Sequence, residues 1–122
     1  MTKSEIKKLD IKWSSKVKED AKFRCEISGF TKGQCQLHSH HFIGRRYRSL
    51  RWWLPNGVCL SASSHTMSIW SAHENPEWFR KEMIDSRGQK WLNELKERSN
   101  KIYKGSYQKV NDYLDGKIKD YL

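Results

Sequence analysis

Apolar side chains recur at helical spacing toward both ends of the chain, whereas the middle of the chain lacks this period. Near the start, Ser14 or Ser15 is a candidate N-cap for a short helix over Lys16–Phe23, in which Val17 and Ala21 face inward. The pattern predicts helical flanks around an irregular centre.

The middle of the chain has the composition of turns and strands. Two glycines within residues 25–33 indicate a turn, and residues 36–43 predict a strand. Residues 45–55 are typical of a basic loop or a second strand, and residues 58–60 lead into a helix that begins near Ser61–Ser64. The predicted order in this segment is therefore strand, loop and helix.

The last third of the chain carries clear helix boundaries. Asn75 is a candidate N-cap, Pro76 occupies the first helical position, and Gly88 is a candidate end of the same helix. A further helix is expected over Gln89–Tyr103, and the spacing within residues 107–122 predicts a last helical segment. We expect the apolar positions of the first two helices to pack in the core; these are Trp78, Phe79, Met83, Ile84, Trp91, Leu92, Leu95 and Ile102.

Length and composition limit the fold to one α+β domain with a modest core, because the chain has 122 residues and a hydrophobic content of 36%. Three cysteines form no even framework for disulfides, so we expect reduced thiols. No apolar run reaches the ~18 residues that span a bilayer, and the first residues lack the apolar centre of a secretion signal. We therefore expect a cytoplasmic protein that does not enter a membrane.

The net charge of +10 and the pI near 9.7 predict a polyanionic partner, because basic side chains release counterions from phosphates and steer the encounter. The charge is unevenly distributed. Residues 31–73 contain no Asp or Glu, and they contain all five histidines. The basic residues of this window are Lys32, Arg45, Arg46, Arg48 and Arg51. A segment of this composition is expected to accept phosphates close to its histidines.

Four polar residues in this window, His40, His41, Asn56 and His65, can be assigned separate chemical roles. His41 can take a proton from water at neutral pH, since the ordinary pKa of histidine is ~6.5. Successive strand side chains point to opposite faces, so His40 can turn toward a metal while His41 faces the water. His65 can complete the metal site, and the Asn56 carbonyl can accept the second ring N–H of His41. Such a set is suited to phosphodiester hydrolysis.

Three stretches carry a resemblance to a known family: residues 39–46 read SHHFIGRR, residues 50–56 read LRWWLPN, and residues 58–65 read VCLSASSH. They resemble the ββα-metal (HNH) nuclease superfamily and, within it, the phage-encoded group related to the NinG/Rap recombination endonucleases. The sequence NPEWF at residues 75–79 is similar to the helix that follows the motif in that group. The similarity covers about residues 22–95.

The resemblance implies a ββα-metal core, a small β-hairpin followed by a helix, over about residues 22–75, with a helical extension over about residues 75–122 of one domain. It implies His41 as the general base, His40 and His65 as metal ligands, and Asn56 as the residue that orients the base.

By the same resemblance, the chain is a phage protein that cuts DNA in recombination or DNA processing within the bacterial host cytoplasm. One divalent metal ion is implied. Mg²⁺ or Mn²⁺ suits turnover at a water-rich site, and histidines also hold Zn²⁺ or Ni²⁺. Branched or flapped DNA is one expected partner. The choice between DNA and RNA, the number of strands cut, and a homodimeric state are left open.

The sequence departs from the family at a zinc ribbon of two Cys-x-x-Cys pairs that many members carry. The corresponding positions here are Cys25, Ser28, Ser61 and Ser64. A neutral hydroxyl is a poor zinc ligand, so we expect no structural zinc ribbon. Some sites also have a third protein ligand one helical turn after the last histidine, but that position is Ile69, so water is expected there.

The basic segment after the first strand supplies the expected nucleic-acid contacts, which are Arg45, Arg46, Arg48, Arg51 and Trp52. Arginine makes bidentate contacts to phosphate, and a tryptophan can stack on an unpaired base. Packing beneath the loop is the alternative for Trp52 and Trp53, since aliphatic core residues are scarce.

Two alternatives keep a DNA partner without catalysis. In the first, Cys35, His38, Cys59 and His65 bind zinc and make the chain a non-catalytic, zinc-stabilised DNA-binding protein. In the second, a protein descended from a nuclease binds DNA without cutting it. If this zinc site does not form, we expect His38, like His73, to be an ordinary hydrogen-bonded residue without a functional role.

Overall fold

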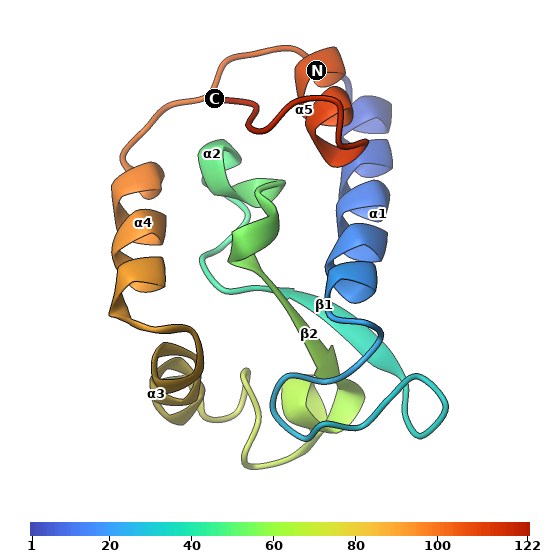
Figure 1. The fold of residues 1–122 in the computed structure, drawn as a ribbon, viewed down its shortest axis with the longest axis vertical. Coiled ribbons are helices and arrows are strands. Elements are labelled where there is room, and N and C mark those ends of the chain that lie inside the picture. Colours follow the sequence, from blue (N-terminus) through green and yellow to red (C-terminus); the bar gives the residue numbers. More distant parts are fainter.

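The sheet is a two-stranded antiparallel hairpin in the lower half of the view, and five α-helices make up most of the remaining fold (Figure 1). The computed structural model describes residues 1–122. It contains two short turns of other helical types, a 3₁₀ turn η1 and a π-helical turn η2. In chain order the elements are α1 (Lys3–Asp20), β1 (Leu37–His41), α2 (Arg48–Arg51), η1 (Leu54–Asn56), β2 (Gly57–Ser61), η2 (Ser63–Met67), α3 (Pro76–Arg87), α4 (Gln89–Ser99) and α5 (Tyr107–Leu114).

The two faces of the hairpin contact different elements, because successive side chains of a strand alternate between faces. On one face, the Ser39 hydroxyl donates a hydrogen bond of 2.7 Å to the Ser14 carbonyl of α1. On the other face, His38 and His40 point toward η2 and α3, and the His40 ring centroid lies 5.2 Å from that of Phe79. The hairpin is therefore held between α1 and the segment that contains η2 and α3.

Helix α1 begins well before the start predicted for it. Thr2 and Glu5 form a reciprocal capping box, in which each side chain accepts a hydrogen bond from the other residue's backbone N–H. Leu9, Trp13 and Val17 are buried at four-residue spacing, which places them on one face of the helix. The prediction of a short helix starting at position 16 was wrong, because it overlooked both the capping pair and the first two buried positions.

The segment predicted as a basic loop or second strand forms the short helical turns α2 and η1 instead. The second strand is β2, which pairs with β1 over its full length. After β2, the five residues Ser63–Met67 make one π-helical turn, where an α-helix was expected to begin. The α+β class is confirmed, and a helical turn begins after the second strand where a helix was expected, but it is one π-helical turn of five residues and not a longer α-helix.

The helices of the last third have the boundaries expected from local signals. The Asn75 side chain accepts a hydrogen bond from the Trp78 N–H, and Gly88 ends α3 with φ +96°, a conformation that favours glycine. Helix α4 ends at Ser99, so Ile102 lies beyond it and is 82% exposed, contrary to the core position predicted. None of the helices combines the length and apolar character needed to cross a membrane.

The C-terminal segment fastens α2 in place. Tyr121 is buried, and its hydroxyl lies 2.9 Å and 2.8 Å from the carbonyl oxygens of Arg48 and Ser49. Arg98 of α4 donates to the Ser49 carbonyl and forms an ion pair of 2.7 Å with Asp120. Helix α2 is therefore held in place by the C-terminal segment and α4, and the carbonyl of its last residue, Arg51, lies 2.9 Å from His41 Nε2.

The close approach of α1 to β2 yields a first prediction. A Cβ added at Gly57 would overlap the Val17 side chain and lie 3.0 Å from the Trp13 ring. Gly57→Ala is therefore expected to lower the free energy of unfolding by about 1–3 kcal/mol through overpacking. Urea denaturation measures the change. Gly33→Ala is the matched control, because nothing lies within 4 Å of a Cβ at that position. Equal stability of the two variants would contradict the packing seen here.

Candidate functional site

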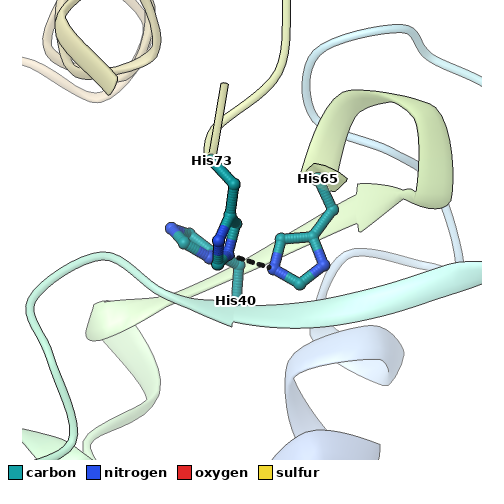
Figure 2. Close-up of side chains that lie close together, drawn as sticks. All are labelled: His40, His65 and His73. Atoms are coloured by element: carbon teal, nitrogen blue, oxygen red, sulfur yellow. Dashed lines mark hydrogen bonds between the residues drawn. The ribbon is translucent and has the colours of Figure 1, made fainter. Parts of the chain in front are cut away.

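Three histidines from separate elements converge beside the hairpin (Figure 2). His40 comes from β1, His65 from η2, and His73 from the loop before α3. One ring nitrogen from each lies within 4.8 Å of those from the other two, and the Nε2 atoms of His65 and His73 are 3.0 Å apart. The set has the size of a metal site with three imidazole ligands.

A loop closed by backbone hydrogen bonds brings the second and third histidines together. The His73 N–H donates to the His65 carbonyl at 3.0 Å, and the Ala72 N–H donates to the Ser64 carbonyl at 2.8 Å. His73 was predicted to be an ordinary hydrogen-bonded residue, so the sequence interpretation missed it as a candidate ligand. The only sequence signal was its position at the end of the window without acidic residues.

The cluster has the electrostatic properties that a metal site of neutral imidazoles requires. Burial lowers the pKa of His40 to about 3, with a further contribution from His65 and His73. Burial also lowers the pKa of His65 to about 4, and the neighbouring histidines act in the same direction. Both rings are therefore uncharged at neutral pH, and a cation would not have to displace a proton from them. The donor set fits a divalent transition metal.

These pKa values predict a loss of stability in acid when chelator keeps the protein metal-free. Below the ordinary pKa of 6.5, His40 takes up a proton in the unfolded chain, whereas the folded protein resists it until about pH 3. The free energy of unfolding is thus unaffected above pH 6.5, and it declines as the pH falls from there toward the pKa of His40 in the folded protein, about 3. Urea midpoints between about pH 7 and pH 4.5 measure the decline. The decline should be shallower in His40→Gln; an identical slope in the variant would contradict the prediction.

His41 points to the opposite face of the hairpin from His40. Its ring stacks on Trp13 of α1, with centroids 3.8 Å apart and planes at 10°. Its Nε2 lies 2.9 Å from the Arg51 carbonyl oxygen. A carbonyl only accepts, so Nε2 carries the proton and Nδ1 of the neutral ring is free to accept one. Burial lowers the pKa of His41, the Arg51 carbonyl partly opposes this, and Arg45 lowers it further.

The Asn56 amide does not contact His41, although it was predicted to orient that ring. Asn56 is fully buried, and its carbonyl oxygen accepts from the Ile43 N–H at 2.9 Å. Its amide nitrogen donates to the carbonyls of Ile43 and Leu50. The Arg51 carbonyl performs the orienting role expected of Asn56, while Asn56 holds together the two ends of the loop between β1 and α2.

This arrangement predicts a mainly structural effect of changing Asn56. Asn56→Ala removes three hydrogen bonds and leaves the backbone groups of Ile43 and the Leu50 carbonyl without their amide partner. We expect the free energy of unfolding to fall by about 1–3 kcal/mol or more. Thermal and urea denaturation provide the measurement. An Asn56→Ala protein of unchanged stability would argue against the structural role.

Asp10 of α1 engages two of the residues predicted to contact nucleic acid. Its carboxylate accepts from Arg51 Nε and Nη2 at 3.0 Å and 2.7 Å, and from Trp52 Nε1 at 2.9 Å. Burial opposes ionisation of Asp10, but these hydrogen bonds outweigh it and lower the pKa of the carboxyl. Trp52 is fully buried, so its packing alternative is the one observed. Arg45, Arg46 and Arg48 are exposed and remain accessible to a ligand.

One open cavity of about 460 Å³ is lined by four of the five histidines: His40, His41, His65 and His73. Asp10 and Trp13 of α1 form part of its wall, and Arg45 forms another part. Asp10 lies outside the acid-free window of residues 31–73 and brings one carboxylate into the cavity wall. The site also extends beyond residues 22–75, where the resemblance placed the core.

The zinc module considered as an alternative is not assembled. Ser39 pairs with Cys59 and His38 pairs with Leu60 across the hairpin, so the Cys59 and His38 side chains point to opposite faces. All three cysteines are free thiols, two of them buried. A four-ligand site that requires both Cys59 and His38 is incompatible with this register.

The four positions that correspond to the zinc ribbon of the similar family, Cys25, Ser28, Ser61 and Ser64, lie close together. Burial would raise the pKa of Cys25, but hydrogen bonds from Ser28, Ser61 and Ser64 lower it to about 7. The Ser28 N–H lies 3.3 Å from the Cys25 sulfur, and the Ser64 N–H donates to the Ser61 hydroxyl at 3.1 Å. Backbone and side-chain groups of these serines thus surround one thiol, and the Ser64–Ser61 hydrogen bond connects two of the positions.

Comparison of the chain with protein-family models, with curated proteins and with solved structures finds no match. The geometry of the site is therefore the basis on which a function can be inferred.

Proposed function

We propose that this protein is a metal-dependent nuclease that hydrolyses phosphodiester bonds, of the ββα-metal (HNH) kind that its sequence resembles. One observation carries the proposal: a histidine with a free, oriented ring nitrogen lines the same cavity as a cluster of three imidazoles. A structural zinc site is normally closed by four protein ligands, whereas three ligands beside an open cavity leave room for water and substrate.

In the proposed site, His40, His65 and His73 hold one divalent cation. When bound, the cation supplies positive charge that stabilises the developing charge on the phosphoryl oxygens. Imidazole donors favour Zn²⁺, Ni²⁺ or Co²⁺, whereas Mg²⁺ prefers oxygen ligands. The cluster therefore supports a transition metal more than the Mg²⁺ that the resemblance suggested, with Mn²⁺ intermediate between them.

His41 is the proposed general base. Its Nδ1 accepts a proton from a water molecule, and the water oxygen forms a bond to phosphorus. The bond from phosphorus to the leaving oxygen then breaks, and the leaving oxygen takes a proton from solvent. The stack on Trp13 and the hydrogen bond to the Arg51 carbonyl hold the ring in one orientation, so little reorganisation is needed at this step.

Nucleic acid is the polymer that the charges support. Arg45 lies in the wall of the cavity, where it can contact a phosphate next to the reacting bond, and Arg46 and Arg48 extend the basic surface. Lysine and arginine outnumber acidic residues by 24 to 14. Within this proposal the partner is DNA, the host compartment is the cytoplasm, and the biological setting is phage recombination or DNA processing.

An exposed apolar surface near the site offers a contact for an unpaired base. Trp70 is 55% exposed, and Met67 and Ile69 beside it are 76% and 74% exposed. They belong to the segment between the two proposed ligands His65 and His73, Met67 as the last residue of η2 and the other two in the bend that follows it. Aromatic side chains stack on unpaired bases of any sequence, so Trp70 replaces the buried Trp52 as the candidate for contact with flapped or branched DNA.

Cleavage assays test the proposal directly. The metal-stripped protein is incubated with linear, flapped and four-way DNA in EDTA and then with Zn²⁺, Ni²⁺, Co²⁺, Mn²⁺ or Mg²⁺. Cleavage that requires a transition metal and is stopped by EDTA is expected, and Trp70→Ala should weaken cleavage of flapped DNA more than of linear duplex. Cleavage undiminished in EDTA, or none with any of the metals, would refute the proposal.

A further inference from the structure

His38 lies against the side of His65 that faces away from the proposed cation site. Its Nδ1 is 2.9 Å from His65 Nδ1, while His65 Nε2 is 3.0 Å from His73 Nε2. His65 therefore lies between two other imidazoles and uses a different ring nitrogen toward each. The His38 ring meets that of His65 edge-on, with centroids 5.1 Å apart and planes at 80°.

The number of ring protons in this row of three hydrogen-bonded histidines determines the tautomer of His65 and of His38. A neutral imidazole carries one N–H, and its other nitrogen accepts a hydrogen bond or binds a metal. If His65 Nε2 binds a cation, the single proton of His65 must lie on Nδ1. That N–H points at His38 Nδ1 across 2.9 Å, so His38 Nδ1 must be bare and the His38 proton must lie on Nε2.

We propose that His38 is a positioning residue that holds His65 in the tautomer and ring orientation needed for metal binding through Nε2. The inference rests on the proposed function, because it requires that the three-histidine cluster binds a cation. A hydrogen-bond acceptor on the second nitrogen of a metal-bound histidine fixes its tautomer and raises its basicity, and removing such an acceptor commonly weakens metal binding 10–100-fold.

The geometry of β1 explains why His38 and His40 both lie close to His65. Positions 38 and 40 are two apart on β1, so both side chains point to the face that η2 covers. His40 belongs to the cluster of candidate ligands, whereas His38 meets only the opposite nitrogen of His65. Because the two nitrogens of an imidazole ring diverge, a group hydrogen-bonded to one of them does not also reach a cation bound to the other. His38 is thus a partner of a ligand and not a fourth ligand.

The tautomers can be read in the wild-type protein loaded with Zn²⁺. Long-range ¹H–¹⁵N correlation spectra of ¹⁵N-histidine-labelled protein distinguish an Nδ1–H ring from an Nε2–H ring. We expect His65 to be protonated at Nδ1 and bound through Nε2, and His38 to be protonated at Nε2. A His38 ring protonated at Nδ1, or a His65 ring bound through Nδ1, would overturn the inference without any substitution.

Zinc affinity of three variants supplies a second test that does not depend on cleavage. Competition with a chromophoric chelator should give a 10–100-fold weaker site in His38→Ala. His38→Gln, whose amide oxygen can accept from His65, should recover part of that loss. Gln36→Ala is the control, because this exposed residue lies next to β1 and outside the histidine chain.

The outcomes separate the two proposals. Absence of zinc binding by the wild-type protein would refute the metal site itself, and the positioning role with it. Tight binding by the wild type together with equal affinity in His38→Ala would overturn the positioning role alone. Circular dichroism identifies an unfolded variant, in which case the wild-type tautomers and His38→Gln decide the question.

Discussion

His41→Ala is expected to lower the rate of DNA cleavage by ~10²–10⁴-fold, the usual contribution of a general base. The structural reason is the pairing of His41 Nε2 with the Arg51 carbonyl, which leaves Nδ1 as the basic nitrogen, while the Trp13 stack holds the ring plane. The carboxylate in the same cavity wall, Asp10, is hydrogen-bonded to Arg51 and Trp52 and is a weaker base than a histidine, so it does not replace that nitrogen in the variant. Single-turnover cleavage at saturating metal is the measurement, because it reports the chemical step and not product release.

Two controls connect this loss to proton transfer. His41→Gln keeps an N–H for the Arg51 carbonyl but has no basic nitrogen, so it should be as inactive as His41→Ala. Added imidazole should restore part of the activity of His41→Ala, because the space beside Trp13 becomes free, and it should not restore His41→Gln. Zinc affinity should stay unchanged in both variants, since His41 lies outside the ligand cluster. Retention of more than about a tenth of wild-type cleavage would refute the assigned base.

His73→Ala is expected to weaken zinc binding by more than ~100-fold, which exceeds the 10–100-fold typical of residues that only support a ligand. The variant leaves two imidazoles, His40 and His65, where three converge in the wild type. Because His73 is exposed, the free energy of unfolding of the metal-free protein should change little. The same chelator competition and a urea denaturation curve measure the two quantities.

Glu74→Ala provides the matched control, since Glu74 is the exposed neighbour of His73 and takes no part in the cluster. Its zinc affinity should equal that of the wild type. Cleavage by His73→Ala should recover when the metal concentration is raised above its weakened affinity, unlike cleavage by His41→Ala. Unchanged zinc affinity in His73→Ala would remove His73 from the ligand set and restore the two-histidine site that the sequence suggested.

Local sequence signals predicted the elements that depend on nearest neighbours. The cap at Asn75 and the stop at Gly88 define α3 because the hydrogen-bonding group and the backbone conformation involved belong to the helix ends themselves. The extent of α1 was predicted poorly, although its capping pair at Thr2 and Glu5 is equally local. That error was one of interpretation, since the signal was present in the sequence.

Other features depended on contacts that no local pattern encodes. Trp52 was predicted to contact a nucleic acid, but it is buried, and its indole N–H donates to Asp10, about forty positions earlier, as the Arg51 guanidinium also does. Asn56 was predicted to orient His41, yet the hydrogen bonds of its amide are made to backbone groups of Ile43 and Leu50. The partner of Trp52 lies far away in the sequence, and the partners of Asn56, six and thirteen positions earlier, are backbone groups of a loop whose path no local pattern predicts.

The sequence by itself determined that His40 and His41 would diverge, because alternation along a strand is a property of the local backbone. It also determined the basic character of the segment around the histidines. Only the tertiary structure decided that His73 joins His40 and His65, that His38 lies behind His65, and that the Arg51 carbonyl orients His41. The physical reason is that these contacts require the chain to reverse after η2 and α1 to pack against the hairpin. The chain reversal and the packing of α1 depend on many side chains together. The residues that they bring into contact therefore show no periodic pattern in the sequence.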